Sequence, residues 1–315
     1  MRLVTYRHGL HGAAAQVGVV QGDRVLRAAA LLGETAPLEM RGLLERGPGG
    51  LIGLGEAVAG FAAGFAAALA VPPEIAVPVW ECELLAPVPS PPSLRDFYAF
   101  EQHVAAGYRA RGREVPGAWY EVPVFYFSHA GGVHGPDAPV RRPAGTQELD
   151  FELEVACVIG QGGRDIPAER AWEHVAGLTI LNDWSARDVQ RQEMSVGLGP
   201  AKGKDFASSL GPWLVTLDEL ADRLADDRHG LWMVARIDGE EVSRGNLKDL
   251  YWTFPQMIER ASRDVDLAPG DVIGSGTVGT GCLLELGTAV HPWLEPGNEV
   301  ELEVERLGRL RNVIV

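Results

Sequence analysis

The clearest alternation of apolar and polar residues lies in residues 149–160. Apolar side chains occupy every second position there, which is the period of a β-strand. The pattern predicts a strand whose apolar side chains share one face, while the other face carries three acids: Asp150, Glu152 and Glu154. A second apolar run, residues 178–182, ends at Asp183. A carboxylate at the end of a buried strand needs a positive partner.

Further apolar segments predict a chain that is mainly β with some α. Glycine-rich turns, such as the one at Asp238-Gly239, separate the strand candidates 213–216, 231–237, 271–273, 282–286 and 299–304. This succession favours a rolled β-sheet or barrel over an alternating βα sheet. Short helices are expected at residues 94–104 and 167–175, and a mobile loop is expected at residues 108–121.

A proline-rich stretch, residues 87–92, predicts a linker because it suits neither a helix nor a central strand. It divides the chain into a small N-terminal α+β domain, residues 1–86, and a β-rich domain, residues 87–315. Residues 51–71 are apolar apart from Glu56 and long enough to span a bilayer. Their Ala- and Gly-rich composition, without flanking aromatic residues, favours a helix packed on the N-terminal domain.

Composition and charge narrow the classes of function. The chain has 315 residues and a formal net charge of −15, which argues against nucleic acid and anionic membranes as partners. Its three cysteines are widely spaced without a CxxC pair, which argues against a disulfide framework or a zinc site. The first residues lack the apolar core of a signal peptide, so we expect a cytoplasmic enzyme.

The acids of the first strand admit two interpretations. Glu152 and Glu154 are separated by roughly 6.5–7 Å between their Cα atoms, so both could reach one cation. They could equally lie on a solvated sheet face, which is the commonest reason for alternation. No feature of the sequence marks Asp150 as a ligand, so Asp150 is predicted to be solvated. Asp183 and Glu285 each interrupt or end an apolar run, so both are predicted to be buried beside a partner.

Two other features carry candidate chemistry. His103 shares a short segment with Asp96 and Tyr98, which makes it a candidate for a catalytic base. Residues 274–279 match GxGxxG, but the strand candidate that follows argues against a dinucleotide site. These glycines instead predict a turn whose backbone N–H groups line a pocket.

Together these segments resemble the fumarylacetoacetate hydrolase family. The likeness lies in DFELE at residues 150–154, LNDWSARDVQ at 181–190, GKDF at 203–206, GTVG at 276–279 and GRLRN at 308–312. It spans about residues 87–315, and NDWSARD is a highly specific motif. Asp96-Phe97-Tyr98 followed by Gln102-His103 is similar to the fumarylacetoacetase branch of the family.

The resemblance implies a rolled β-sheet barrel as the catalytic domain and a role for each matching residue. It implies four metal ligands: Asp96, Glu152, Glu154 and Asp183. It implies that His103 is the base, that Glu285 orients it, and that Lys204 stabilises developing charge. It also implies a set of substrate-binding residues: Tyr98, Tyr126, Arg187, Gln190 and Thr277.

Two positions depart from the family pattern. Met194 stands where a second substrate tyrosine is expected, and Arg109 and Arg111 are both candidates for the substrate arginine. Four carboxylates suit Mg²⁺ or Ca²⁺, with Mn²⁺ also admitted. The family is typically dimeric, so a homodimer is implied.

The implied reaction is metal-dependent hydrolysis of a C–C bond in a β-diketone such as fumarylacetoacetate or an acylpyruvate. Such a cleavage expels a carbanion, so a cation must hold it as an enolate while a base activates water. Two alternatives stay open. One is a decarboxylase, isomerase or hydratase of a 2-oxo acid, and the other is a metal-dependent binding protein on the same scaffold.

Overall fold

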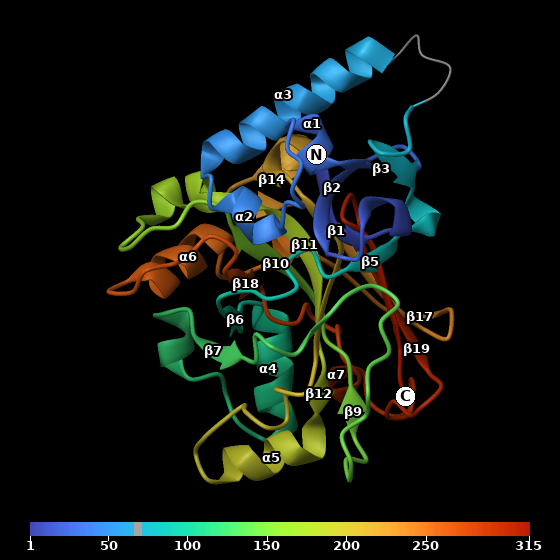
Figure 1. The fold of residues 1–315 in the computed structure, drawn as a ribbon. Helices are drawn as coiled ribbons and strands as arrows, with labels where there is room; N and C mark the ends of the chain where they lie inside the picture. Colours follow the sequence, from blue (N-terminus) through green and yellow to red (C-terminus); the bar gives the residue numbers. More distant parts are fainter. Residues whose placement is uncertain (66–70) are drawn as a thin grey trace.

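The computed structural model describes residues 1–65 and 71–315 and is built around a long path of hydrogen-bonded strands (Figure 1). The strand order is β4 (Ala76–Pro78), β3 (Arg24–Arg27), β2 (Gln16–Gln21), β1 (Arg2–Arg7), β13 (Ser208–Val215), β11 (Val175–Asp183), β10 (Leu153–Ile159), β18 (Val272–Gly274), β6 (Leu94–Phe97) and β7 (Phe125–Ser128). The mainly β prediction is confirmed. Within the described ranges the path ends at β4 and β7 without closing, so the sheet is open where a barrel was expected.

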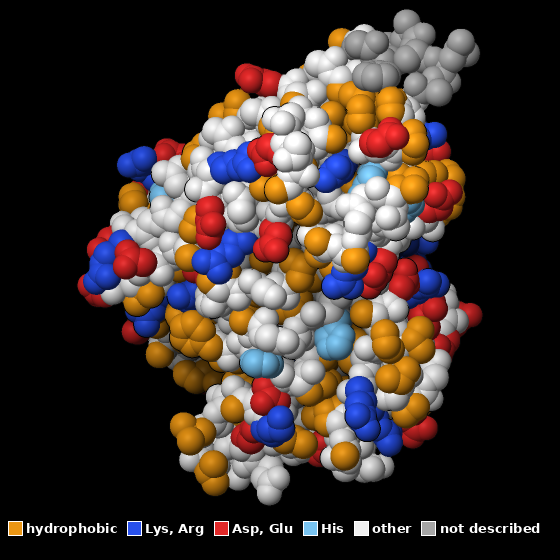
Figure 2. All heavy atoms as spheres, in the orientation of Figure 1, with side chains coloured by type: hydrophobic (Ala, Val, Ile, Leu, Met, Phe, Trp, Pro, Cys, Tyr) orange, Lys and Arg blue, Asp and Glu red, His pale blue; other side chains and the backbone are white. Residues whose placement is uncertain are grey.

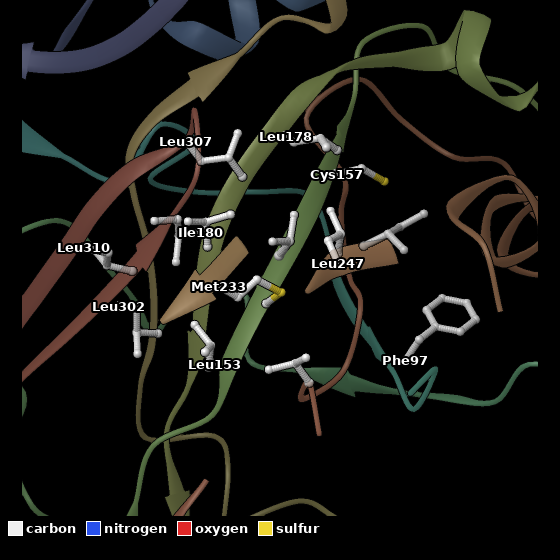
Figure 3. Close-up of a cluster of buried hydrophobic side chains, with 14 of the residues drawn as sticks. Phe97, Leu153, Cys157, Leu178, Ile180, Met233, Leu247, Leu302, Leu307 and Leu310 are labelled. Atoms are coloured by element: carbon white, nitrogen blue, oxygen red, sulfur yellow. The ribbon is translucent and has the colours of Figure 1, made fainter. Parts of the chain in front are cut away.

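A second sheet covers one face of this path and forms the main core. Its order is β17 (Glu240–Asn246), β16 (Trp232–Ile237), β19 (Glu299–Val304) and β20 (Gly308–Val313). Leu153 and Cys157 of β10 and Ile180 of β11 pack there against Met233 and Leu302 (Figure 3). The predicted turn between β16 and β17 is confirmed, with positive φ angles at Asp238 and Gly239, 51° and 85°.

The N-terminal segment covers part of the other face. Its helices are α1 (Ala28–Leu31), α2 (Met40–Leu44) and α3 (Pro48–Phe65). Ala156 and Val158 of β10 pack in this second cluster, so both faces of β10 are buried and the solvated-face alternative is wrong. β1 pairs with β13, which brings the N-terminal strands into the central sheet. A domain boundary at residue 86 stays a prediction.

In Figure 1, α4, α5, β6 and β7 lie together in the lower half of the molecule. The remaining helices are α4 (Glu101–Ala110), α5 (Arg187–Ser195), α6 (Phe254–Ser262) and α7 (Leu283–Leu286). The short strands are β5 (Glu83–Leu85), β8 (Val133–His134), β9 (Leu149–Asp150), β12 (Ser185–Ala186), β14 (Leu224–Ala225) and β15 (Arg228–His229). The 3₁₀ turns are Gly9–His11, Val79–Glu81, Gly117–Tyr120, Ala168–His174, Leu217–Arg223 and Leu247–Asp249.

Several local predictions are wrong in type. Residues 94–97, expected to be helical, form β6, because all four side chains are buried between β18 and β7. Residues 283–286, expected to be a strand, form the one-turn helix α7. The expected loop 108–121 holds the end of α4 and a 3₁₀ turn. The helix expected within residues 51–71 is α3, which is described up to Phe65; residues 66–70 lie outside the described part of the chain.

Two surface properties follow from the fold. Basic and acidic side chains are interleaved on the face shown in Figure 2. Of the helices in residues 1–65 and 71–315, none combines the length and apolarity needed to cross a bilayer.

Candidate active site

A cavity of about 330 Å³ brings most of the predicted site residues together. It lies where β6, the start of β10 and the turn after β18 meet α4 and α5. The predicted residues in its wall are Asp96, Tyr98, His103, Tyr126, Glu152, Glu154, Arg187, Gln190, Lys204 and Thr277. The other two predicted residues contact this wall from behind, since Asp183 binds Lys204 and Glu285 binds His103.

Three carboxylates converge in the wall of the cavity. Single oxygen atoms of Asp96, Glu152 and Glu154 all lie within 4.8 Å of one another, and the three residues are buried. Asp183, at the end of β11, joins them through Lys204, whose Nζ lies 2.6 Å from Glu152 Oε2 and 2.5 Å from Asp183 Oδ2. The four acids that the family resemblance proposed as ligands are therefore brought to one place.

The close approach depends on two glycines in the turn after β18. A Cβ atom at Gly274 would clash with the carboxylate of Asp96, and one at Gly276 would clash with the carbonyl of Phe97. The Gly276 N–H donates to Asp96 Oδ1 at 3.2 Å and to Glu154 Oε2 at 3.1 Å. The Thr277 hydroxyl donates to Glu154 Oε1 at 3.3 Å. The GxGxxG segment is thus a turn against the carboxylates, as its glycines predicted.

Burial and mutual repulsion oppose ionisation of these acids. Burial, together with the charge of Asp183, raises the pKa of Asp96 to about 8. Burial raises the pKa of Glu154 well above its usual range, and the charge of Asp96 adds to this effect. Burial also acts on Glu152, but the cations Lys204 and Arg187 outweigh it and lower that pKa. Full ionisation of the cluster therefore needs an additional positive charge.

The donor set fits a hard divalent cation. The available atoms are carboxylate oxygens, which Mg²⁺, Ca²⁺ and Mn²⁺ prefer. Asp183 Oδ1 is buried and has no hydrogen-bond partner among the described residues, which is costly unless a cation accepts its lone pair. Its other oxygen, Oδ2, accepts hydrogen bonds from Lys204 and from the Tyr126 hydroxyl.

We expect Mg²⁺ binding to release protons at neutral pH. Because the pKa of Asp96 is about 8 in the metal-free protein, this group is mostly protonated at pH 7 and must lose its proton to act as a ligand. Apparent affinity should then rise by about tenfold per pH unit per proton released, and the contribution of Asp96 should level off above pH 8. Calorimetry at pH 7 in buffers of different ionisation enthalpy measures the release. An enthalpy independent of the buffer would contradict the protonated cluster.

The second functional group is a histidine–carboxylate pair. His103 of α4 and Glu285 of α7 meet with 2.9 Å between Nδ1 and Oε2, and both side chains are largely buried. The ring of Tyr98 packs edge-on against the imidazole, with 5.6 Å between ring centroids. A carboxylate at Nδ1 favours the tautomer that carries its proton there, which leaves Nε2 as the basic nitrogen. The pair therefore has the geometry of a base with its orienting acid.

Asp150 is the main site residue that sequence reasoning missed. It was predicted to be solvated, but it is fully buried. Its carboxylate accepts hydrogen bonds from the N–H groups of Leu283 and Leu284, at 2.7 and 3.0 Å, and from Arg187 Nε at 2.8 Å. Arg187 in turn lies 2.8 Å from Glu152. Asp150 therefore ties the helix that carries Glu285 to the carboxylate cluster.

Replacing Asp150 by alanine should lower the free energy of unfolding by about 3–5 kcal/mol, because buried Arg187 would lose one of its two carboxylate partners and the N–H groups of Leu283 and Leu284 would lose their acceptor. Urea unfolding measures this loss. Asp205→Ala is the control, since Asp205 forms only a surface pair with Lys202 and should cost less than about 1 kcal/mol. Equal losses in the two variants would contradict the role assigned to Asp150.

The substrate-side residues occupy the rest of the wall. Burial raises the pKa of the Tyr98 phenol to about 12, so it remains a hydroxyl donor. Gln190 accepts a hydrogen bond from Arg187 Nη1 at 3.1 Å, and both side chains line the cavity. Arg111 lines the cavity together with Met194, and Arg109 does not. The structure thus separates the two arginines that the sequence left equivalent.

Comparison with known proteins places this site in a family. The family model described as Fumarylacetoacetate (FAA) hydrolase C-terminal matches residues 93–315. A fumarylacetoacetase from Oryza sativa is 32% identical over 297 residues, covering 75% of this chain and 69% of the relative. The protein therefore belongs to the fumarylacetoacetate hydrolase family, as its motifs predicted.

Two further relatives illustrate the range of the family. A mitochondrial oxaloacetate tautomerase from Homo sapiens is 37% identical over 194 residues, covering 61% of this chain and 59% of the relative. The solved fumarylacetoacetate hydrolase of Exiguobacterium antarcticum is 25% identical with a TM-score of 0.70, covering 100% of this chain and 99% of that one. Against the fumarylacetoacetases of Bos taurus and Arabidopsis thaliana, the chain spans only 60% and 57% of their length.

Proposed function

We propose that this protein is a divalent-metal-dependent hydrolase that cleaves a C–C bond in a β-diketone such as fumarylacetoacetate or an acylpyruvate. The observation that carries the proposal is the His103–Glu285 pair in the wall of the cavity that holds the carboxylate cluster. A cation site alone would serve several reactions, whereas hydrolysis also needs a base for water. The fumarylacetoacetases among the relatives support this assignment.

The proposed ligands are Asp96, Glu152, Glu154 and Asp183, and Mg²⁺, Ca²⁺ or Mn²⁺ would suit them. When bound, the cation supplies a Lewis acid for the oxygens of a 2-oxo acid or diketone. His103 takes a proton from water, whose oxygen attacks the distal carbonyl carbon. Glu285 stabilises the imidazolium that forms. The C–C bond then breaks, its electron pair stays on the departing methylene carbon, and the imidazolium returns a proton to that carbon.

Lys204 has a charge role in this scheme. Its ammonium lies within hydrogen-bond distance of Glu152 and Asp183, and their charges raise its pKa although burial opposes them. Lys204 therefore stays cationic throughout the working pH range and offsets part of the excess negative charge of four carboxylates. Its positive charge also favours negative charge that develops on a substrate oxygen in the same cavity.

We expect Arg111 to meet the distal end of the substrate. Arg111→Gln should raise KM for a substrate with a distal carboxylate, such as fumarylacetoacetate, by about 10-fold or more, because a charge-assisted hydrogen bond of about 1.5–3 kcal/mol is lost. For acetylpyruvate, which ends in a methyl group, KM should change little. Arg109→Gln is the matched control, since Arg109 does not line the cavity. A larger effect of Arg109→Gln would reverse the assignment.

A second candidate function is isomerisation, tautomerisation, decarboxylation or hydration of a 2-oxo acid. The oxaloacetate tautomerase that is 37% identical favours it. A tautomerase moves a proton at carbon and needs no attack by water, so the same carboxylates and His103 could serve it. A third candidate, a metal-dependent binding protein, would show no turnover.

A substrate panel distinguishes these functions. The purified protein is assayed with Mg²⁺ on fumarylacetoacetate, acetylpyruvate and oxaloacetate. Hydrolysis of either diketone supports the first proposal. Turnover of oxaloacetate alone overturns it in favour of a tautomerase or decarboxylase. The absence of turnover on all three substrates leaves the metal-dependent binding protein. A homodimer is also proposed, and light scattering tests it.

A further inference from the structure

A second group of possible ligand atoms lies beside the base and includes a cysteine. One atom each from His103, Cys282 and Glu285 fall within 4.8 Å of one another. Cys282 directly precedes α7 and is fully buried, while the side chains of His103 and Glu285 are only 11% and 9% exposed. Sequence spacing argued against zinc because the three cysteines are far apart without a CxxC pair, but folding brings Cys282 beside a histidine that is distant in the chain.

The two clusters differ in chemistry. The carboxylate cluster offers oxygen atoms only, which suit hard cations. The second cluster offers one sulfur, one imidazole nitrogen and one carboxylate oxygen, which is the donor mixture that Zn²⁺ binds, usually with a fourth ligand such as water. Of the three residues, His103 lines the cavity, from which a water molecule can supply that fourth ligand. Saturating Mg²⁺ would therefore occupy the first cluster and leave the second available.

The charges around Cys282 favour a cation that replaces the thiol proton. Burial raises the pKa of Cys282 well above its usual range, and the negative charges of Asp150 and Glu152 add to this effect, although Arg187 opposes it. The same acids that disfavour a thiolate attract a metal ion. When Zn²⁺ binds, the thiol loses its proton to solvent and the site gains one net positive charge.

We propose that Cys282, His103 and Glu285 form a second, soft-cation site at which Zn²⁺ inhibits the enzyme. The inhibition rests on the proposed function, because the site includes the base and its orienting acid. Zinc bound to His103 occupies a lone pair of the imidazole. Zinc bound to Glu285 competes for the carboxylate that accepts the hydrogen bond from Nδ1–H. His103 then cannot accept a proton from water.

Binding is tested first, without substrate. Co²⁺ is added to the protein in excess Mg²⁺, because a cobalt–thiolate bond gives a charge-transfer absorption that carboxylate ligands do not give. We expect the band in the wild type and in Cys82→Ser, which removes the more accessible thiol, and its loss in Cys282→Ser and Cys282→Ala. Circular dichroism and Mg²⁺ titration show that each variant is folded. No band in the wild type, or a band that persists in folded Cys282 variants, overturns the site.

Inhibition is tested second, with a substrate that the panel identifies. In saturating Mg²⁺, Zn²⁺ should inhibit the wild type and Cys82→Ser, whereas Cys282→Ser should keep its basal turnover and need about 10- to 100-fold more Zn²⁺. Equal zinc sensitivity of wild type and Cys282→Ser overturns the inhibitory role. If the panel shows no turnover, the proposed hydrolase function fails, and the cobalt spectra still decide the site.

Discussion

Replacing His103 by alanine is expected to lower kcat for a β-diketone by about 10²–10⁴-fold, which is the usual contribution of a general base. Mg²⁺ affinity should stay nearly unchanged, because the carboxylate cluster does not use the imidazole as a ligand. The expected pattern is thus loss of turnover with retention of binding. Steady-state kinetics and Mg²⁺ calorimetry on the same preparation measure the two properties.

His291→Ala is the matched control for this variant. Among the described residues, His291 forms a side-chain hydrogen bond only with its neighbour Pro292, to whose carbonyl oxygen Nδ1 donates, and it does not line the cavity, so its loss should leave kcat unchanged. Full hydrolytic activity in His103→Ala would remove His103 from the mechanism. A parallel loss of Mg²⁺ affinity would mean that the substitution disturbs the carboxylate cluster and not only the base.

Replacing Asp96 by asparagine should have opposite effects on metal binding and on metal-free stability. Mg²⁺ affinity should fall by more than about 100-fold, because even residues that only support metal ligands contribute 10- to 100-fold. The metal-free variant should be more stable than the wild type at pH 9, by on the order of 3–5 kcal/mol, since it lacks a buried carboxylate that ionises there.

The sign follows from the pKa of Asp96, which is about 8 in the folded protein and near its ordinary value of 3.8 when unfolded. Its protonated form stabilises the folded state fully below pH 3.8, and this contribution is lost as the pH rises towards 8. The asparagine side chain of the variant does not titrate. Denaturant unfolding in chelator should therefore show similar stabilities at low pH and a gap that widens up to pH 8. A variant less stable than the wild type at pH 9 would contradict the raised pKa of Asp96.

Periodicity predicted the strand that carries the acids, and family motifs predicted their partners. Glu154 and Asp183 lie where those two signals placed them, at the start of β10 and the end of β11. Alternation alone left a solvated face open. That alternative is wrong because the N-terminal segment and the site together bury the second face of β10. A local sequence pattern cannot show that residues distant in the chain pack on that face.

Contacts between distant parts of the chain account for what the sequence could not predict. Asp150 accepts hydrogen bonds from the backbone of Leu283 and Leu284, more than 130 positions away. These two residues begin the helical turn α7, although their apolar sequence predicted a strand. Residues 94–97 resemble a helix start, but they form β6 because all four are buried between β18 and β7, and the register with β18 then places Asp96 beside Gly274. The cluster at Cys282 is likewise formed only by folding.

In the proposed reaction, water cleaves a C–C bond with His103 as the base. The most direct measurement is turnover of acetylpyruvate with Mg²⁺ in water enriched in heavy oxygen, followed by mass spectrometry of the products. We expect acetate and pyruvate in equal amounts, with one heavy oxygen incorporated into the acetate carboxylate. Consumption of oxaloacetate by the same preparation, with acetylpyruvate left intact and no labelled acetate, would contradict it.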